Sequence, residues 1–305
     1  MLPIVHHPAY VAEDVPATHR FPMGKFRAVA EACVRTGLAA SFEDFHRPAP
    51  APESWLALAH DPAYVDQVCR QTVPAPLERK IGFKMTAPVA LRSRCAVAGT
   101  ALAARLALEH GAACNTAGGS HHAAHDGGAG FCVFNDVAVA ARLMQAEGLA
   151  RRVLVIDLDV HQGDGTARIF KADASVFTLS VHCEENWPRR KAVSDLDLGL
   201  PRGTGDADYL KAAKAAVENA LEAARPDLVF YNAGVDPHRE DRLGLLDLTD
   251  AGLAAREAMV FEAVMRRGVP IVGVLGGGYS RDIEALAGRH VLLHRAAAEA
   301  LSAYA

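Results

Sequence analysis

The chain has 305 residues, of which 50% are hydrophobic and 22% charged, and its formal net charge is −4. This length and composition are typical of one large folded domain and exclude a disordered chain. The charge does not indicate the concentrated basic surface that a nucleic-acid partner usually needs. No apolar run approaches the roughly 20 residues that span a bilayer, so we expect neither a nucleic-acid nor a membrane partner.

Six cysteines are scattered along the chain, and no two have the C-x-x-C spacing of metal or redox motifs. We interpret them as reduced thiols with packing roles. The first ten residues lack the charged and long apolar regions of a secretory signal. These observations predict a cytoplasmic protein.

Predicted strands and helices alternate along the chain. Helical spacing is found first over residues 89–108, and a strand is predicted over 112–115. Continuous apolar runs, which are typical of strands buried on both faces, occur next at 153–156, 176–179, 228–231 and 269–274, and helical segments at 207–224 and 251–267. The alternation predicts a doubly wound α/β fold. Because the chain has no repeat and no long linker, we expect residues 1–305 to form a single domain.

The segment VLVIDLDVHQGDG, residues 153–165, contains the first candidate metal ligands. Its apolar strand runs directly into Asp157, Asp159 and His161. If the extended conformation continues, these side chains share one face. Two acids at the end of so apolar a strand are costly without a partner, and a carboxylate and an imidazole can bind one divalent ion. The alternative is a turn whose acids only cap the next helix.

A third ligand is predicted by YNAGVD, residues 231–236, in which Asp236 follows the strand at 228–231. Sites in such sheets collect at the carboxyl ends of the strands, so Asp236 can converge on Asp159 and His161. A catalytic zinc usually has three protein ligands and one open position. On ligand type alone, an Asp–His–Asp set suits zinc or ferrous iron.

Two glycine-rich segments contain the candidate catalytic side chains. His121 and His122 lie in AGGSHHAAHDGGAGF, residues 117–131, and a tandem pair in this setting indicates acid/base catalysis near neutral pH. A flexible polar loop is the alternative, and we interpret His125 as solvated. The run LGGGY, residues 275–279, lacks the spacing of a phosphate-binding loop. We predict instead that its glycines place Tyr279 at the site as a hydrogen-bond donor.

The motifs GGSHHAAHDGGAGF, IDLDVHQGDG, YNAGVD and LGGGY, in this order, resemble those of the histone deacetylase superfamily. Some stretches resemble its class IV and bacterial members, and the resemblance spans most of the chain. It implies an arginase-like α/β domain with a mainly parallel sheet of about eight strands and helices on both faces. It also implies a zinc-dependent deacylase whose substrate is an acylated amine, most readily an acyl-lysine of a peptide or protein.

The resemblance implies two metal sites. Asp159, His161 and Asp236 match the zinc ligands of the family, although ferrous iron remains an alternative. A structural potassium ion is also implied, with Asp157, Ser180 and nearby backbone carbonyls as its ligands.

The resemblance also gives the two histidines different roles. His122 matches the main general base, and His121 is its partner. Asp157 is implied to support His121 and Asp164 to support His122, each by fixing the orientation of an imidazole ring.

The walls of a substrate tunnel are implied as well. Tyr279 matches the tyrosine that polarises the scissile carbonyl. Gly130 and Phe131 match one wall of the acyl-lysine tunnel, and Trp187 and Leu243 match other wall positions.

Three other functions stay open at this point. An acetylpolyamine amidohydrolase would use the same chemistry on a small acylated amine. An arginase-type ureohydrolase would need a two-metal cluster with additional acids, which the motifs do not supply. An inactive acyl-lysine-binding scaffold is the alternative outside the enzymes.

Overall fold

The strands predicted from the apolar runs belong to one sheet. The computed structural model describes residues 1–304, and within them the sheet has seven strands, all parallel: β1 (Ile4–Val5), β2 (Ala112–Asn115), β3 (Val153–Asp157), β4 (Val176–Cys183), β5 (Leu196–Leu200), β6 (Leu228–Asn232) and β7 (Ile271–Val274). The order across the sheet is β1-β2-β7-β6-β3-β4-β5.

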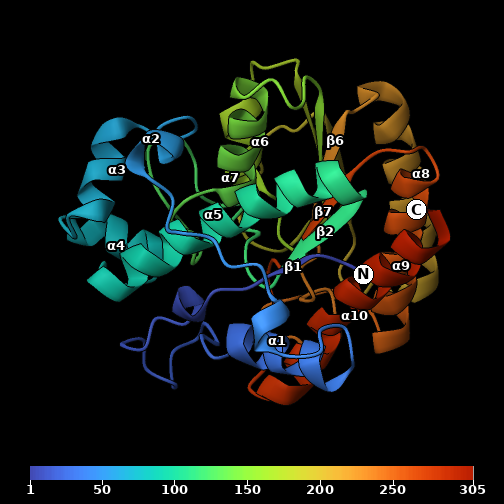
Figure 1. The fold of residues 1–305 in the computed structure, drawn as a ribbon, viewed down its shortest axis with the longest axis horizontal. Helices are drawn as coiled ribbons and strands as arrows, with labels where there is room; N and C mark the ends of the chain where they lie inside the picture. Colours follow the sequence, from blue (N-terminus) through green and yellow to red (C-terminus); the bar gives the residue numbers. More distant parts are fainter. Residues whose placement is uncertain (305) are drawn as a thin grey trace.

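Helices connect the strands (Figure 1). Their bounds are α1 (Lys25–Arg35), α2 (Glu53–Leu56), α3 (Pro62–Cys69), α4 (Ala75–Ile81), α5 (Ala87–His110), α6 (Asp136–Ala146), α7 (Asp164–Phe170), α8 (Asp206–Ala224), α9 (Asp250–Met265) and α10 (Ile283–Tyr304). The long helix α5 has clear local signals at both ends. The Thr86 side chain accepts a hydrogen bond from the backbone N–H of Val89 at its start, and Gly111, at φ +93°, ends it before β2.

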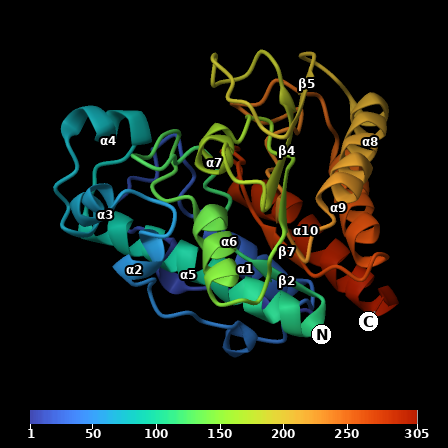
Figure 2. The same ribbon diagram turned by 90° about the horizontal axis from the view of Figure 1, so that it is seen from above.

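Helices cover both faces of the sheet. Figure 2 looks nearly along the sheet, with α6 and α7 on one side and α8 and α9 on the other. All residues of β3 and β6 are buried, as expected for central strands of a parallel sheet that is covered twice.

The prediction of an α/β fold with a parallel sheet is confirmed, although the described residues contain seven strands rather than about eight. The sequence did not predict β1 and β5, which form the two edges of the sheet. β1 has only two residues, and β5 alternates between half-buried and exposed positions before Leu200, so neither has a continuous apolar run. Among residues 1–304, no helix combines the length and apolarity that crossing a membrane requires.

The order of the strands reverses beside β3. From β3 the chain proceeds outward through β4 and β5, and then returns to place β6 on the other side of β3. The connections leave β3 and β6 in opposite directions, which opens a crevice at their carboxyl ends. The segments after β3 and β6, which contain the predicted metal ligands, meet at this crevice.

Candidate active site and metal centre

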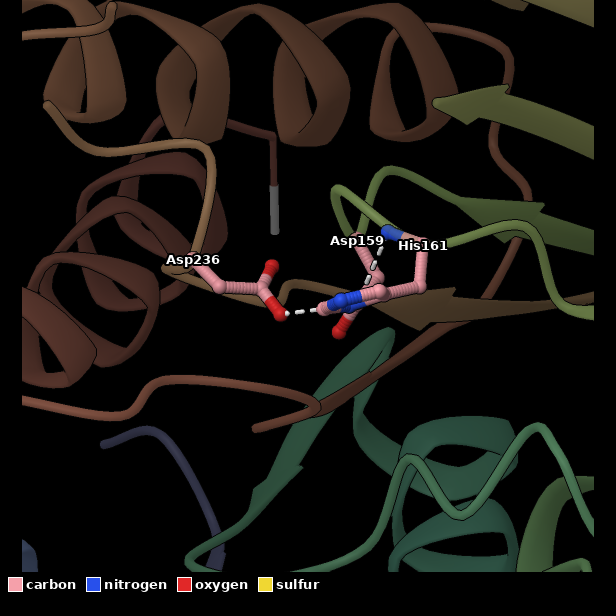
Figure 3. Close-up of side chains that lie close together, drawn as sticks. All are labelled: Asp159, His161 and Asp236. Carbon is pink, nitrogen blue, oxygen red and sulfur yellow. Dashed lines mark hydrogen bonds and ion pairs between the residues drawn. The ribbon is translucent and has the colours of Figure 1, made fainter. Parts of the chain in front are cut away.

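The three predicted zinc ligands lie together in the crevice. Figure 3 shows the side chains of Asp159, His161 and Asp236 pointing toward one another. β3 ends at Asp157, so the extended conformation does not continue through the motif as the alternation argument assumed. Asp159 and His161 instead belong to the irregular loop between β3 and α7, and this loop brings them toward Asp236 from the segment after β6.

The donor set fits a divalent cation. His161 Nδ1 lies 3.1 Å from Asp159 Oδ1 and 3.1 Å from Asp236 Oδ2, and candidate donor atoms of the three residues lie within 4.8 Å of one another. All three side chains are buried. Burial by itself lowers the pKa of His161, but hydrogen bonds from the imidazole to the two carboxylates raise it to about 10. Two buried carboxylates around one imidazole therefore attract positive charge, and an oxygen–nitrogen–oxygen set is one that zinc accepts.

The glycine run packs directly against these carboxylates. The backbone N–H of Gly277 donates to Asp159 Oδ2 at 2.7 Å. A Cβ atom at Gly277 would lie 2.1 Å from Asp236 Oδ2, closer than any real contact. The glycine is therefore required by space, and the loop holds Tyr279 at a fixed position relative to the candidate ligands.

Each of the tandem histidines is paired with its own aspartate. His121 Nδ1 donates to Asp157 Oδ2 at 2.7 Å, and His122 Nδ1 donates to Asp164 Oδ1 at 2.7 Å. The two Nε2 atoms lie 3.1 Å apart. Both rings thus present Nε2 to the same place, beside the candidate metal ligands.

The surroundings give the two histidines different charge states. Burial opposes the charged form of His121, but the carboxylates of Asp157 and Asp159 raise its pKa to about 9. Burial and the charge of His121 together lower the pKa of His122 to about 3, although the contact with Asp164 acts in the opposite direction. Near neutral pH, His122 can accept a proton while His121 holds one.

A cavity of about 310 Å³ leads from the surface to these groups. His122 and His161 lie on its lining, and the other lining residues are Arg20, Gly130, Phe131, Asn186, Trp187, Leu243 and Tyr279. All four predicted tunnel residues therefore line one cavity with Tyr279. Trp187 is 42% exposed at the surface end, and its ring meets the His122 ring edge-on at 4.4 Å between centroids.

Two predicted site residues lie opposite each other in neighbouring strands. Asp157 of β3 pairs with Ser180 of β4 in the parallel register. Asp157 Oδ1 accepts from Asn232 Nδ2 at 3.0 Å, and Ser180 Oγ is 3.0 Å from His182 Nδ1. The sheet thus places both predicted potassium ligands toward the carboxyl ends of β3 and β4, next to the loop that provides Asp159 and His161.

Sequence reasoning missed three supporting residues. Asp241 accepts hydrogen bonds from the backbone N–H groups of Tyr279, at 2.7 Å, and Leu243, at 2.8 Å, so it joins two walls of the cavity. The side-chain amide of Asn232 donates a hydrogen bond to Asp157. Lys25, which is fully buried, donates from Nζ to the carbonyl of Gly276 at 3.0 Å. Asn232 and Asp241 lie within or beside the quoted motifs, whereas no sequence pattern connects Lys25 with a loop 251 residues away.

Comparisons with known proteins agree with this geometry. The sequence profile of the histone deacetylase domain matches residues 19–294. The chain is 50% identical to an uncharacterized protein of Picosynechococcus sp., over 97% of this chain and 98% of that protein. It is 32% identical to histone deacetylase 2 of Arabidopsis thaliana, over 87% of this chain and 70% of that protein. The crystal structure of the HDA15 HD domain superposes with a TM-score of 0.80 at 25% identity, covering 99% of this chain and 92% of that one.

The chain belongs to the histone deacetylase family. The fold, the family profile and the buried site together identify it as a deacetylase or deacylase domain of hydrolytic type.

Proposed function

We propose that this protein is a zinc-dependent amidohydrolase that removes the acyl group from Nε-acyl-lysine. One observation supports this best: His161, a candidate metal ligand, and His122, a candidate base, line the same cavity as Tyr279. A carbonyl group that reaches the end of this cavity meets an electrophilic centre, a proton acceptor and a hydroxyl donor together.

Asp159, His161 and Asp236 would hold the zinc ion. When bound there, zinc would polarise the substrate carbonyl and lower the pKa of a bound water toward about 7. Potassium would be held near the carboxyl ends of β3 and β4 by Asp157 and Ser180, together with backbone carbonyls of the β3–α7 loop and of β4.

The chain's own residues move the protons. The Nδ1–H of His122 donates to Asp164, which leaves its Nε2 unprotonated as an acceptor, so His122 takes the proton of the attacking water. His121 is held in its charged form by Asp157 and Asp159 and can protonate the amine as it leaves. The Tyr279 hydroxyl donates to the oxyanion, a type of interaction worth roughly 2.7–4 kcal/mol in the transition state.

The cavity walls favour a substrate whose side chain has a long apolar stem and ends in a short acyl group. Phe131, Trp187 and Leu243 offer apolar surface to the methylenes of lysine. Beyond Gly130 and Tyr279 the free space is only about 20 Å³, which is room for roughly one water-sized group. We therefore propose acetyl-lysine as the preferred substrate and place the reaction in the cytoplasm.

The test combines a substrate panel with Tyr279→Phe. The purified enzyme, with its metal content measured, is assayed on acetyl- to myristoyl-lysine peptides and on acetylated polyamines. We expect the acetyl peptides to react fastest. In Tyr279→Phe, zinc content should stay unchanged while kcat on the best peptide falls roughly 10²–10³-fold.

Two results would contradict the proposal. Faster turnover of acetylated polyamines than of any peptide would remove acyl-lysine as the substrate class. A kcat of Tyr279→Phe within about threefold of the parent would remove the hydroxyl from the mechanism.

A further inference from the structure

A second, larger cavity lies beside the entrance of the catalytic cavity. It has a volume of about 790 Å³, within the roughly 300–1,000 Å³ of ligand-binding cavities. Most residues of the segment 11–24, although not Asp14, provide its lining together with Arg242, Ser280 and Arg281, and we call it the arginine groove. The two cavities are neighbours, since Arg20 lines both.

The arginine groove has an excess of unneutralised positive charge. Arg20, Arg242 and Arg281 are all exposed, and within residues 1–304 no carboxylate oxygen lies within 4.0 Å of their guanidinium nitrogens. Some other surface arginines do have such a partner, as in Arg239 with Asp247 at 3.4 Å. Glu13 is the single acidic residue of the lining. Since the whole chain has a net charge of −4, this concentration of positive charge is local.

The segment after Trp187 has basic residues as well. Arg189 and Arg190 are exposed and follow directly after Trp187 and Pro188 at the rim. Positive charge near the entrance attracts anionic groups and repels cations.

Resting on the proposed function, we infer that the arginine groove binds acidic side chains that flank the acyl-lysine in a peptide or protein substrate. When the acyl-lysine side chain fills the catalytic cavity, the neighbouring residues lie over the rim, at about 3.3 Å per residue of extended chain. Aspartate or glutamate within a few residues can then reach Arg20, Arg242 or Arg281. Arginine favours this contact because its planar group donates two parallel hydrogen bonds to one carboxylate.

Three peptides test the inference. They share one acetyl-lysine and differ only in flanking residues, which are acidic, neutral amides or basic. For the parent enzyme at low salt, kcat/KM should be about tenfold higher for the acidic than for the neutral peptide, as expected for a few exposed ion pairs, and lower still for the basic one. The preference should shrink in 0.5 M salt, since exposed charges are screened at a Debye length of about 3–10 Å.

The double variant Arg242→Gln/Arg281→Gln is compared with Arg295→Gln. Arg295 is an exposed arginine in the middle of α10, about 18 Å along the helix from Ile283. The double variant should lose most of the acidic preference while its kcat/KM on the neutral peptide stays within about threefold. Arg295→Gln should keep the full preference.

A binding measurement separates the two proposals. Anisotropy of a fluorescein-labelled acidic peptide gives its affinity independently of turnover. Suppose that both the acidic and the neutral peptide are hydrolysed with equal kcat/KM and bound with equal affinity. The inference that the arginine groove binds acidic residues would then be overturned, and the proposed function would stand. If no peptide is hydrolysed, the proposed function fails, and the groove is judged by the affinities alone. Inhibition by inorganic phosphate without any peptide preference would indicate a general anion site and overturn the inference.

Discussion

The pairs His121–Asp157 and His122–Asp164 have the same contact distance, 2.7 Å. The pKa values of their histidines are nevertheless shifted in opposite directions. The pKa of His121 is raised to about 9, and that of His122 is lowered to about 3. The difference comes from a further neighbour: His121 Nε2 is 3.8 Å from Asp159 Oδ1, whereas His122 faces the charged His121. A buried carboxylate partner therefore does not by itself decide the charge of a histidine.

His60 provides a reference for this comparison because no carboxylate contacts it in the described residues. Its Nδ1 donates to the carbonyl of Ala124 and its Nε2 accepts from the backbone N–H of Asn135, each at 2.9 Å. Burial lowers its pKa to about 4, the same direction as for His122. His122 thus behaves like a buried histidine without a partner, and Asp164 mainly fixes its orientation.

The largest effect is expected when each histidine is replaced in turn. His122→Ala should reduce kcat by roughly 10²–10⁴-fold, the usual contribution of a general base. His121→Ala should cost less, because His122 still accepts the proton of the water. Steady-state kinetics of both variants on the same peptide measure the ratio. Equal and small losses, with zinc content retained, would break the assignment of distinct roles.

A smaller effect is expected on the pH dependence of the free energy of unfolding, through His60. The unfolded chain protonates His60 below pH 6.5 but the folded chain only near pH 4. Its stabilising contribution is therefore complete above pH 6.5 and is lost as the pH falls toward 4. Between pH 7 and pH 5 the parent should lose about 2 kcal/mol of unfolding free energy through this group.

His60→Gln should lack this part of the pH dependence, since the amide does not titrate. Urea unfolding of parent and variant at both pH values isolates it, because the other histidines contribute equally to both proteins. The same pH slope in the two proteins would show that His60 is not held neutral by the fold.

The smallest effect concerns Arg168, which contacts Asp164 Oδ2 at 2.5 Å with a half-exposed side chain. Arg168→Gln leaves the charge of Asp164 more available to His122, so the pKa of His122 should rise. The acidic limb of the pH profile of kcat/KM should move to higher pH by less than about one unit, as expected for a partly exposed ion pair. A shift to lower pH would mean that Arg168 does not compete for Asp164.

Local patterns predicted the central part of the fold and the ligand set. The runs at 153–156 and 228–231 are continuous and apolar, so they identified β3 and β6, and the acids after them identified the crevice. The edge strands were not predicted, because β1 is too short and β5 is too exposed to have a continuous apolar run. Helix α10 was not predicted either.

Long-range contacts are the part that the sequence does not contain. Nothing near Lys25 indicates that its ammonium reaches the Gly276 carbonyl, and nothing near Arg20 indicates that it lies beside Tyr279 and Trp187. Such contacts depend on how the N-terminal segment packs across the finished sheet. The strand-alternation argument failed for a related reason, because the β3–α7 loop takes its shape from its neighbours after Asp157.

The close fit of Gly277 against Asp159 and Asp236 has a consequence for the divergence of this enzyme. A backbone that touches two candidate metal ligands cannot accept a side chain, so mutational routes to a new substrate through Gly277 are closed. Arg242 and Arg281 are exposed and do not contact the candidate ligands, so each can change without disturbing them. Natural variation and laboratory evolution of substrate preference should therefore accumulate at the rim, while the glycine run stays constant.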